Sequence, residues 1–182
     1  MVRRLQPDEM TGTTLTSTSA RDLMLAAMEA NATDLLSYFR RRVTNPEDAA
    51  DLLGETALTA WRRIEKLPAD PEKARMWLFV TARHTAANFG RRTVHRFELS
   101  DSLRTLLRTQ ANRDPSESTG TALDVRRAVQ RLAPRQREIV MLIHWDGFTV
   151  AETAEILQTS PSTVRARYGR ASEQLRTELG AD

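Results

Sequence analysis

The sequence predicts an all-α protein of two small helical domains joined by a flexible linker. Apolar residues recur at the three- and four-residue spacing of helices, and no alternating pattern of useful length predicts a strand. A length of 182 residues is sufficient for two small domains. Turn-forming residues interrupt the helical pattern at 113–120, which separates the two domains.

The first part of the chain is expected to hold a tail and two helices. Residues 1–19 are rich in Thr and Ser and carry no apolar face, so they are predicted to be disordered. The first domain is predicted over residues 20–95. Its first predicted helix has apolar residues at Leu23, Ala26 and Ala27. A second helix, with apolar residues at Leu35, Leu36 and Phe39, is predicted to end in the arginine triplet 40–42.

The clearest start signal for a helix lies at residues 45–48. Asn45 can cap the helix, Pro46 suits its first position, and two acidic residues follow at the positive end of the helix dipole. The helix should continue to about Lys66, with Leu52, Ala60, Trp61 and Ile64 on its apolar side. A loop at 67–71 and a longer helix over about 72–94 follow, the latter carrying Trp77, Leu78, Val80 and Phe89.

The linker is predicted over residues 96–121 and the second domain over 122–182. Apolar spacing in the second domain predicts four helices, at about 122–131, 135–145, 149–157 and 161–179. The last two helices are separated by only three residues, which is the arrangement of a helix-turn-helix.

Composition limits the possible functions. The net charge is +3 and the pI is near 9.9, with arginine supplying all the positive charge except two lysines. Arginine binds phosphate well, although a GC-rich genome also favours it. There is no cysteine, and the three histidines, at 84, 95 and 144, lack metal-ligand spacing. We therefore expect no metal, no cofactor and no catalytic residue. Without a membrane span or a signal peptide, a cytoplasmic protein is expected.

The helix predicted at 161–179 has the pattern of a DNA-reading helix. Ser160 can cap it, Pro161 can begin it, and a stripe of Val164, Tyr168 and Ala171 should be buried. The opposite face has no acidic residue before position 171, unlike an ordinary solvated arginine face, which usually carries acids that pair with the arginines. The residues predicted to contact duplex DNA are Ser162, Thr163, Arg165, Ala166, Arg167 and Arg170.

A second acid-free basic stretch lies in the first domain, between Glu72 and Glu98, with aromatic residues interspersed. Cations with stacking rings suit single-stranded DNA. Trp77 and Phe89 are more readily explained as core residues, whereas His84 and Asn88 are polar and one helical turn apart. The residues predicted to contact the strand are Arg83, His84, Asn88, Arg91 and Arg92.

These motifs together resemble a known family. Residues 45–56, 77–83 and 91–92 resemble region two of sigma factors, and residues 163–167 with 170–171 resemble region four. The lack of a substantial middle domain resembles the extracytoplasmic-function group of the sigma-70 family. The resemblance covers about residues 20–180 and implies a factor that joins core RNA polymerase and directs promoter-specific initiation.

The resemblance also implies particular contacts. The helix at 46–66 would bind the coiled coil of the polymerase β′ subunit through Asp48, Asp51 and Glu55, although dipole complementation also explains the first acids. The loop at 67–74 would help to trap an unstacked base of the minus-ten element. The region-four helix would read the minus-thirty-five element, and an anti-sigma factor would hold the protein inactive. A β-flap contact could be made by the apolar face of Ile139, Val140 and Ile143. The alternative is that these residues pack into the local core.

The sequence departs from the family pattern at four positions. Gly54 lies where glutamine is common, Ala57 replaces a large apolar residue, Ala166 lies where serine is frequent, and Gly169 is unusually small. The strongest alternative function is a stand-alone helix-turn-helix regulator of duplex operator DNA, whose first domain would serve dimerisation or ligand binding. An enzyme is a third, less supported alternative.

Overall fold

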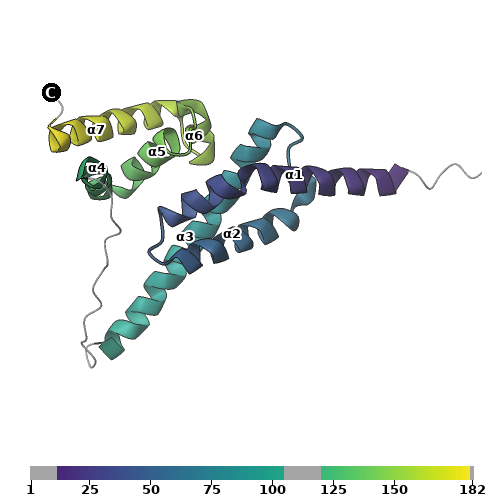
Figure 1. The fold of residues 1–182 in the computed structure, drawn as a ribbon, viewed down its shortest axis with the longest axis horizontal. Coiled ribbons are helices and arrows are strands. Elements are labelled where there is room, and N and C mark those ends of the chain that lie inside the picture. Colours follow the sequence, from purple (N-terminus) through teal and green to yellow (C-terminus); the bar gives the residue numbers. More distant parts are fainter. Residues whose placement is uncertain (1–11, 105–119, 181–182) are drawn as a thin grey trace, which may run out of the picture. The chain divides into compact units, whose positions relative to one another are not determined.

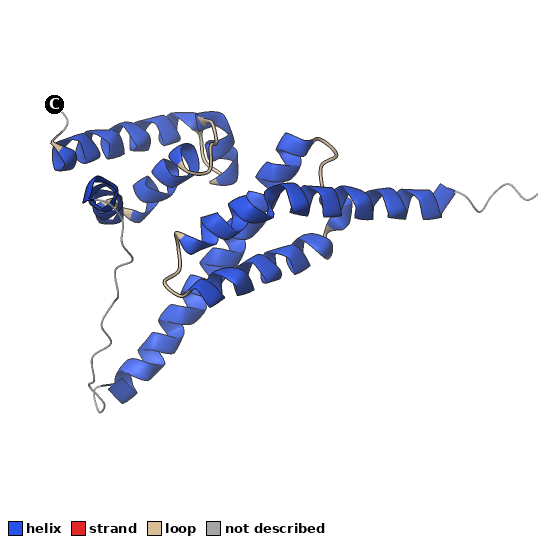
Figure 2. Ribbon diagram, viewed as in Figure 1, coloured by secondary structure: helices blue, strands red, loops and turns tan. Residues whose placement is uncertain are grey.

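The computed structural model describes residues 12–104 and 120–180, and their regular structure is entirely helical (Figures 1 and 2). The all-α prediction is therefore confirmed for these residues. The chain divides into two compact units, one up to Arg92 and the other from Thr93 onward. Each unit has its own buried core, and each is described separately below.

The first unit contains α1 (Gly12–Arg40), α2 (Pro46–Trp61), the short 3₁₀ helix η1 (Ile64–Lys66) and most of α3 (Pro71–Arg104). α2 runs back along α1, and the two helices pack against each other (Figure 1). The ring of Tyr38 on α1 meets the ring of Phe79 on α3 edge-on, with 5.4 Å between centroids. This aromatic contact ties α3 to the pair formed by α1 and α2.

The first helix differs from the prediction in length and in phase. Two helices were expected within residues 20–42, but α1 is continuous and includes residues 12–19, which were expected to be disordered. No glycine or proline interrupts residues 13–40, so nothing in the sequence stops the helix. Leu23 is 40% exposed and Ala26 is also exposed, whereas the predicted positions Leu35 and Phe39 are fully buried. The other buried positions of this stripe are Met24, Asn31 and Tyr38. Residues 1–11 lie outside the described residues.

The second helix starts as predicted and ends earlier. The Asn45 side chain accepts a hydrogen bond of 3.0 Å from the backbone N–H of Glu47, so the predicted cap is confirmed. α2 ends at Trp61, and the chain continues through η1 to Lys66. Trp61 is 44% exposed, which corrects its assignment to the apolar side. The stripe that packs inward is Ala49, Leu52, Thr56 and Ala60.

The third helix extends well beyond its predicted end near Val94, to Arg104. It begins where Asp70 accepts a hydrogen bond of 2.9 Å from the backbone N–H of Lys73. No proline follows until position 115, so the helix enters the first part of the predicted linker, 96–121. The remainder of that linker, 105–119, lies outside the described residues.

The second unit follows the prediction closely. Its helices are α4 (Gly120–Arg131), α5 (Pro134–His144), α6 (Val150–Ile156) and α7 (Pro161–Leu179). One core cluster contains Val140 and Ala171, the other contains Ile139 and Val164, and the half-buried ring of Tyr168 packs against both. α7 is thereby held against α4, α5 and α6.

Candidate nucleic-acid interface

The link between α6 and α7 has a well-defined geometry. Thr149 and Glu152 form a reciprocal capping box at the start of α6, in which Glu152 accepts from the Thr149 backbone N–H at 2.7 Å. After α6, Gln158 adopts a left-handed backbone with φ of 53°. Ser160 then accepts a hydrogen bond of 3.2 Å from the backbone N–H of Thr163 and caps α7 as predicted. These local bonds fix the direction in which α7 leaves the turn.

α7 buries the predicted stripe, with Val164 and Ala171 fully buried. The predicted contact residues lie on the remaining surface: Thr163 and Arg167 are half-buried, and the exposed members are Ser162, Arg165, Ala166 and Arg170. Within the described part of the chain, none of these three arginines has a carboxylate within salt-bridge distance. The helix therefore presents unneutralised guanidinium groups to solvent.

Two of the predicted contact residues also take part in the start of α7. The Ser160 hydroxyl lies 2.9 Å from that of Ser162 and 2.8 Å from that of Thr163. This small hydroxyl cluster sits where the first N–H groups of the helix are unpaired, a position that favours an anion. Spacing alone predicted the exposure of these side chains but not their mutual hydrogen bonds.

Sequence reasoning missed an aromatic contact between α5 and α7. The rings of His144 and Tyr168 stack with centroids 5.7 Å apart, and His144 Nε2 lies 2.9 Å from the Tyr168 hydroxyl. Trp145, the next residue, is 44% exposed. The two ring positions are 24 residues apart, so no local pattern could have paired them.

The predicted strand-contact residues of the first unit lie on α3. His84, Asn88, Arg91 and Arg92 are exposed, and Arg83 is half-buried. Asn88 accepts a hydrogen bond from the guanidinium of Arg91. The three positions 84, 88 and 91 recur at helical spacing, so their side chains lie along one side of the helix.

The aromatic residues of α3 divide into two groups. Phe79 is fully buried and is not available for stacking on a base. The guanidinium of Arg75 lies 4.9 Å from its ring centroid, and Arg75 also forms a 2.9 Å ion pair with Asp34 on α1. Trp77 and Phe89 are half-buried, so they are neither the fully buried core residues that were expected nor fully exposed.

The acidic residues predicted to bind polymerase lie on α2, where Asp51 is exposed and Asp48 and Glu55 are half-buried. Glu55 lies 3.6 Å from Arg92 on α3, in a pair whose side chains are 42% and 67% exposed. An ion pair this exposed contributes little to stability. The contact nevertheless joins one predicted polymerase residue to one predicted DNA residue, which the sequence did not indicate.

The predicted β-flap face is largely unavailable. Ile139 and Val140 are almost fully buried in the two core clusters, and Ile143 packs against one of them. The alternative that these residues form the local core is therefore confirmed. They lie on the inward side of α5, where α6 and α7 cover them.

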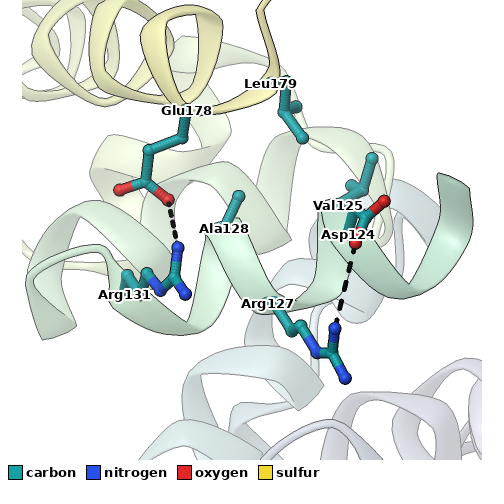
Figure 3. A pocket seen from close by; sticks show the side chains of 7 residues that line it. All are labelled: Asp124, Val125, Arg127, Ala128, Arg131, Glu178 and Leu179. Atoms are coloured by element: carbon teal, nitrogen blue, oxygen red, sulfur yellow. Dashed lines mark ion pairs between the residues drawn. The ribbon is translucent and has the colours of Figure 1, made fainter. Parts of the chain in front are cut away.

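A groove of about 350 Å³ lies between α4 and the end of α7 (Figure 3). Val125, Ala128 and Leu179 contribute its apolar lining. Two ion pairs lie at its edge, Arg131 with Glu178 at 3.7 Å and Arg127 with Asp124 at 4.0 Å (Figure 3). Because each arginine faces a carboxylate, one of them Glu178 near the end of α7, this groove lacks the acid-free character of residues 161–171.

Other kinds of site receive no support from the described residues. No group of three or more potential ligands among them is placed to hold a metal ion. Within the same ranges, no helix combines the length and the apolar character that a membrane crossing requires.

Comparison with known proteins gives two family matches in the order of the two units. The sigma-70 region 2 model matches residues 27–97, and the sigma-70 region 4 model matches residues 122–175. The region 4 match covers α5, α6 and most of α7, and the region 2 match covers α2, η1 and most of α3.

Individual relatives agree with these matches. The RNA polymerase sigma-E factor of Streptomyces coelicolor is 32% identical over 151 residues, which are 81% of this chain and 80% of the relative. The ECF RNA polymerase sigma factor BldN of the same organism is 30% identical over 148 residues, and the match spans 80% of this chain but only 56% of BldN. A solved structure of the sigma factor RpoE with the anti-sigma factor NepR from Bartonella quintana has a similar fold, with a TM-score of 0.61, 22% identity, and coverage of 89% of this chain and 97% of that one.

Proposed function

Since the chain belongs to the sigma-70 family of RNA polymerase sigma factors, in its extracytoplasmic-function group, we propose that its two units perform two different parts of promoter recognition. The chain binds core RNA polymerase and directs promoter-specific initiation. A stand-alone helix-turn-helix regulator is not favoured, because the region 2 match accounts for the first unit as well. The sigma-70 family is not an enzyme family.

The second unit is proposed to read the duplex minus-thirty-five element through α7. The observation that carries this proposal is the acid-free outer surface of residues 161–171 of α7, where Arg165, Arg167 and Arg170 have no carboxylate within salt-bridge distance among the described residues. Arginine contacts to guanine discriminate between bases by about 1–3 kcal/mol for each bidentate pair. The proposed contact residues are Ser162, Thr163, Arg165, Ala166, Arg167 and Arg170.

The first unit is proposed to hold the opened minus-ten strand along α3. Arg83, His84, Asn88, Arg91 and Arg92 would line the strand. The segment 67–74, which comprises the loop 67–70 and the first turn of α3, would hold an unstacked base. Separating a base from its stack costs a few kcal/mol, and contacts to the extruded base and its phosphates offset this cost. The exposed part of Trp77 offers a stacking surface, whereas the buried ring of Phe79 does not.

The contact with polymerase is proposed to lie on α2, where Asp48, Asp51 and Glu55 recur at helical spacing and face a helix of the β′ coiled coil. A β-flap contact through Ile139 and Val140 is not proposed, because both are buried. We also propose an anti-sigma partner, a proposal supported by the similar fold of RpoE, which is bound to NepR. A protein with these partners would work in the cytoplasm.

Transcription in vitro tests the proposal. Purified core polymerase with the chain should produce transcripts from a pool of genomic DNA, and their start sites should share two upstream elements at a fixed spacing. Core enzyme alone is the control. Transcripts whose start sites share no upstream elements would exclude promoter recognition by this chain.

A further inference from the structure

Gly54 lies in the middle of α2, where glycine weakens a helix. Its backbone does not require glycine, since the left-handed positions of the described residues are Gln158, Gly147 and Gly180. Space within the chain does not require it either, because a Cβ atom built at Gly54 meets nothing within 4 Å. Nothing among the described residues therefore requires glycine at position 54, and close contact with another molecule would give the missing side chain a role.

The residues around Gly54 form a recognisable packing site. Asp51, Gly54, Glu55 and Leu58 stand at positions i, i+3, i+4 and i+7, which are the four positions that form the hole for a side chain of a partner helix. Leu58 is 61% exposed, and the Glu55 side chain is 42% exposed. Without a Cβ atom at position 54, this hole is deeper than any other residue would allow.

We propose that this hole, defined by Asp51, Gly54, Glu55 and Leu58, receives one long basic side chain, Arg or Lys, from a helix of core RNA polymerase. The proposal rests on the proposed function, in which α2 faces polymerase. Gly54 would permit close approach of the two helix backbones. The two carboxylates would bind the charged group, and Leu58 would pack against its methylene stem.

A positively charged group already lies beside this hole in the free protein. The guanidinium of Arg92 already lies 3.6 Å from the Glu55 carboxylate. Both side chains of this pair are substantially exposed, so its replacement by a guanidinium or ammonium group of the partner would cost little. A neutral or acidic partner side chain that displaced Arg92 would leave the carboxylates of Asp51 and Glu55 without a cation.

The test is to fill the hole without damaging the fold. Gly54→Ala and Gly54→Leu should raise the melting temperature, because both residues favour a helix more than glycine does. Their Kd for core polymerase, measured by fluorescence anisotropy without DNA, should nevertheless rise, about threefold for Ala and tenfold or more for Leu, because an overfilled site packs poorly. Stability and affinity are thus predicted to move in opposite directions.

Gly90 provides a matched control, since it is also exposed, lies in a helix and has nothing within 4 Å of a Cβ atom. Gly90→Ala and Gly90→Leu should raise the melting temperature and leave the Kd for core polymerase unchanged. Gly54→Leu with wild-type affinity, or an equal loss in the Gly90 variants, would overturn the inference.

Asp51→Lys separates this inference from the proposed function. The proposed function predicts that this charge reversal weakens core binding more than tenfold. If Asp51→Lys weakens binding and Gly54→Leu does not, α2 faces polymerase but the hole is unused. If Asp51→Lys also binds normally, the polymerase contact proposed for α2 is itself wrong.

Discussion

At the scale of single residues, the proposed reading of duplex DNA depends on arginines that have no carboxylate partner among the described residues. Arg165, Arg167 and Arg170 differ in this respect from Arg127 and Arg131, each of which has a carboxylate at 4.0 Å or less. A guanidinium without an internal partner keeps its hydrogen-bond donors available for a guanine edge or a phosphate. The absence of acids between residues 161 and 171 is therefore the feature of the sequence that matters most for promoter reading.

Arg170→Ala should lower initiation in proportion to the lost upstream contact. If Arg170 contacts a base, initiation should fall roughly 5- to 150-fold, which corresponds to about 1–3 kcal/mol. If it contacts a phosphate, initiation should fall by less. Multiple-round transcription on one promoter measures the effect, and binding to core polymerase should remain unchanged. Arg176→Ala, at an exposed position further along α7, is the control and should behave as wild type. Loss of core binding in Arg170→Ala would contradict this assignment.

Arg91→Ala should weaken the interaction with the opened strand at low salt more than at high salt. If Arg91 contacts one phosphate of a single strand, its removal should reduce the slope of log K against log salt concentration by about 0.7. Binding of a minus-ten oligonucleotide by the assembled holoenzyme measures this slope. An unchanged slope would show that Arg91, which is hydrogen-bonded to Asn88, serves α3 alone.

At the scale of elements, the short helix α6 depends on its cap. α6 has only seven residues, and Thr149 and Glu152 satisfy N–H groups at its start. Thr149→Ala should therefore destabilise the second unit by about 0.5–2 kcal/mol. Urea unfolding of the whole chain measures the change, followed by the fluorescence of Trp145 in a background in which the other two tryptophans are replaced, Trp61→Phe and Trp77→Phe. Thr177→Ala, whose hydroxyl bonds only back to Glu173 of its own helix, should have a smaller effect, and the reverse order would contradict the role given to the cap.

The accuracy of the sequence prediction also differs between elements. The helices of the second unit were predicted to within about two residues, because caps such as Ser160 and prolines such as Pro161 are local signals. The start of α1, its continuity and the end of α3 were wrong, because nothing in the sequence stops the helix at the predicted points, whereas the predicted end of α1 in the arginine triplet was correct. The exposure of the α7 residues followed from helical spacing, but the pairs His144–Tyr168 and Glu55–Arg92 join distant positions and required the fold.

At the scale of the whole molecule, the two units are proposed to bind two forms of DNA. In the region 4 unit, α7 packs on the other helices and exposes one side, and such a helix fits the major groove of a duplex. The region 2 unit presents polar and basic side chains along α3, which suit a separated strand. Each unit has its own core, so a substitution on one surface should leave the fold and the contacts of the other intact.

The most direct measurement of this division compares transcription from one promoter on fully paired DNA and on DNA with a permanently unpaired minus-ten region. The defect of Arg91→Ala should become at least severalfold smaller on the unpaired template, because no strand separation is then required. The defect of Arg170→Ala should be the same on both templates, because its contact lies upstream in the duplex. If unpairing rescues both variants equally, or neither, the two units do not recognise two forms of DNA.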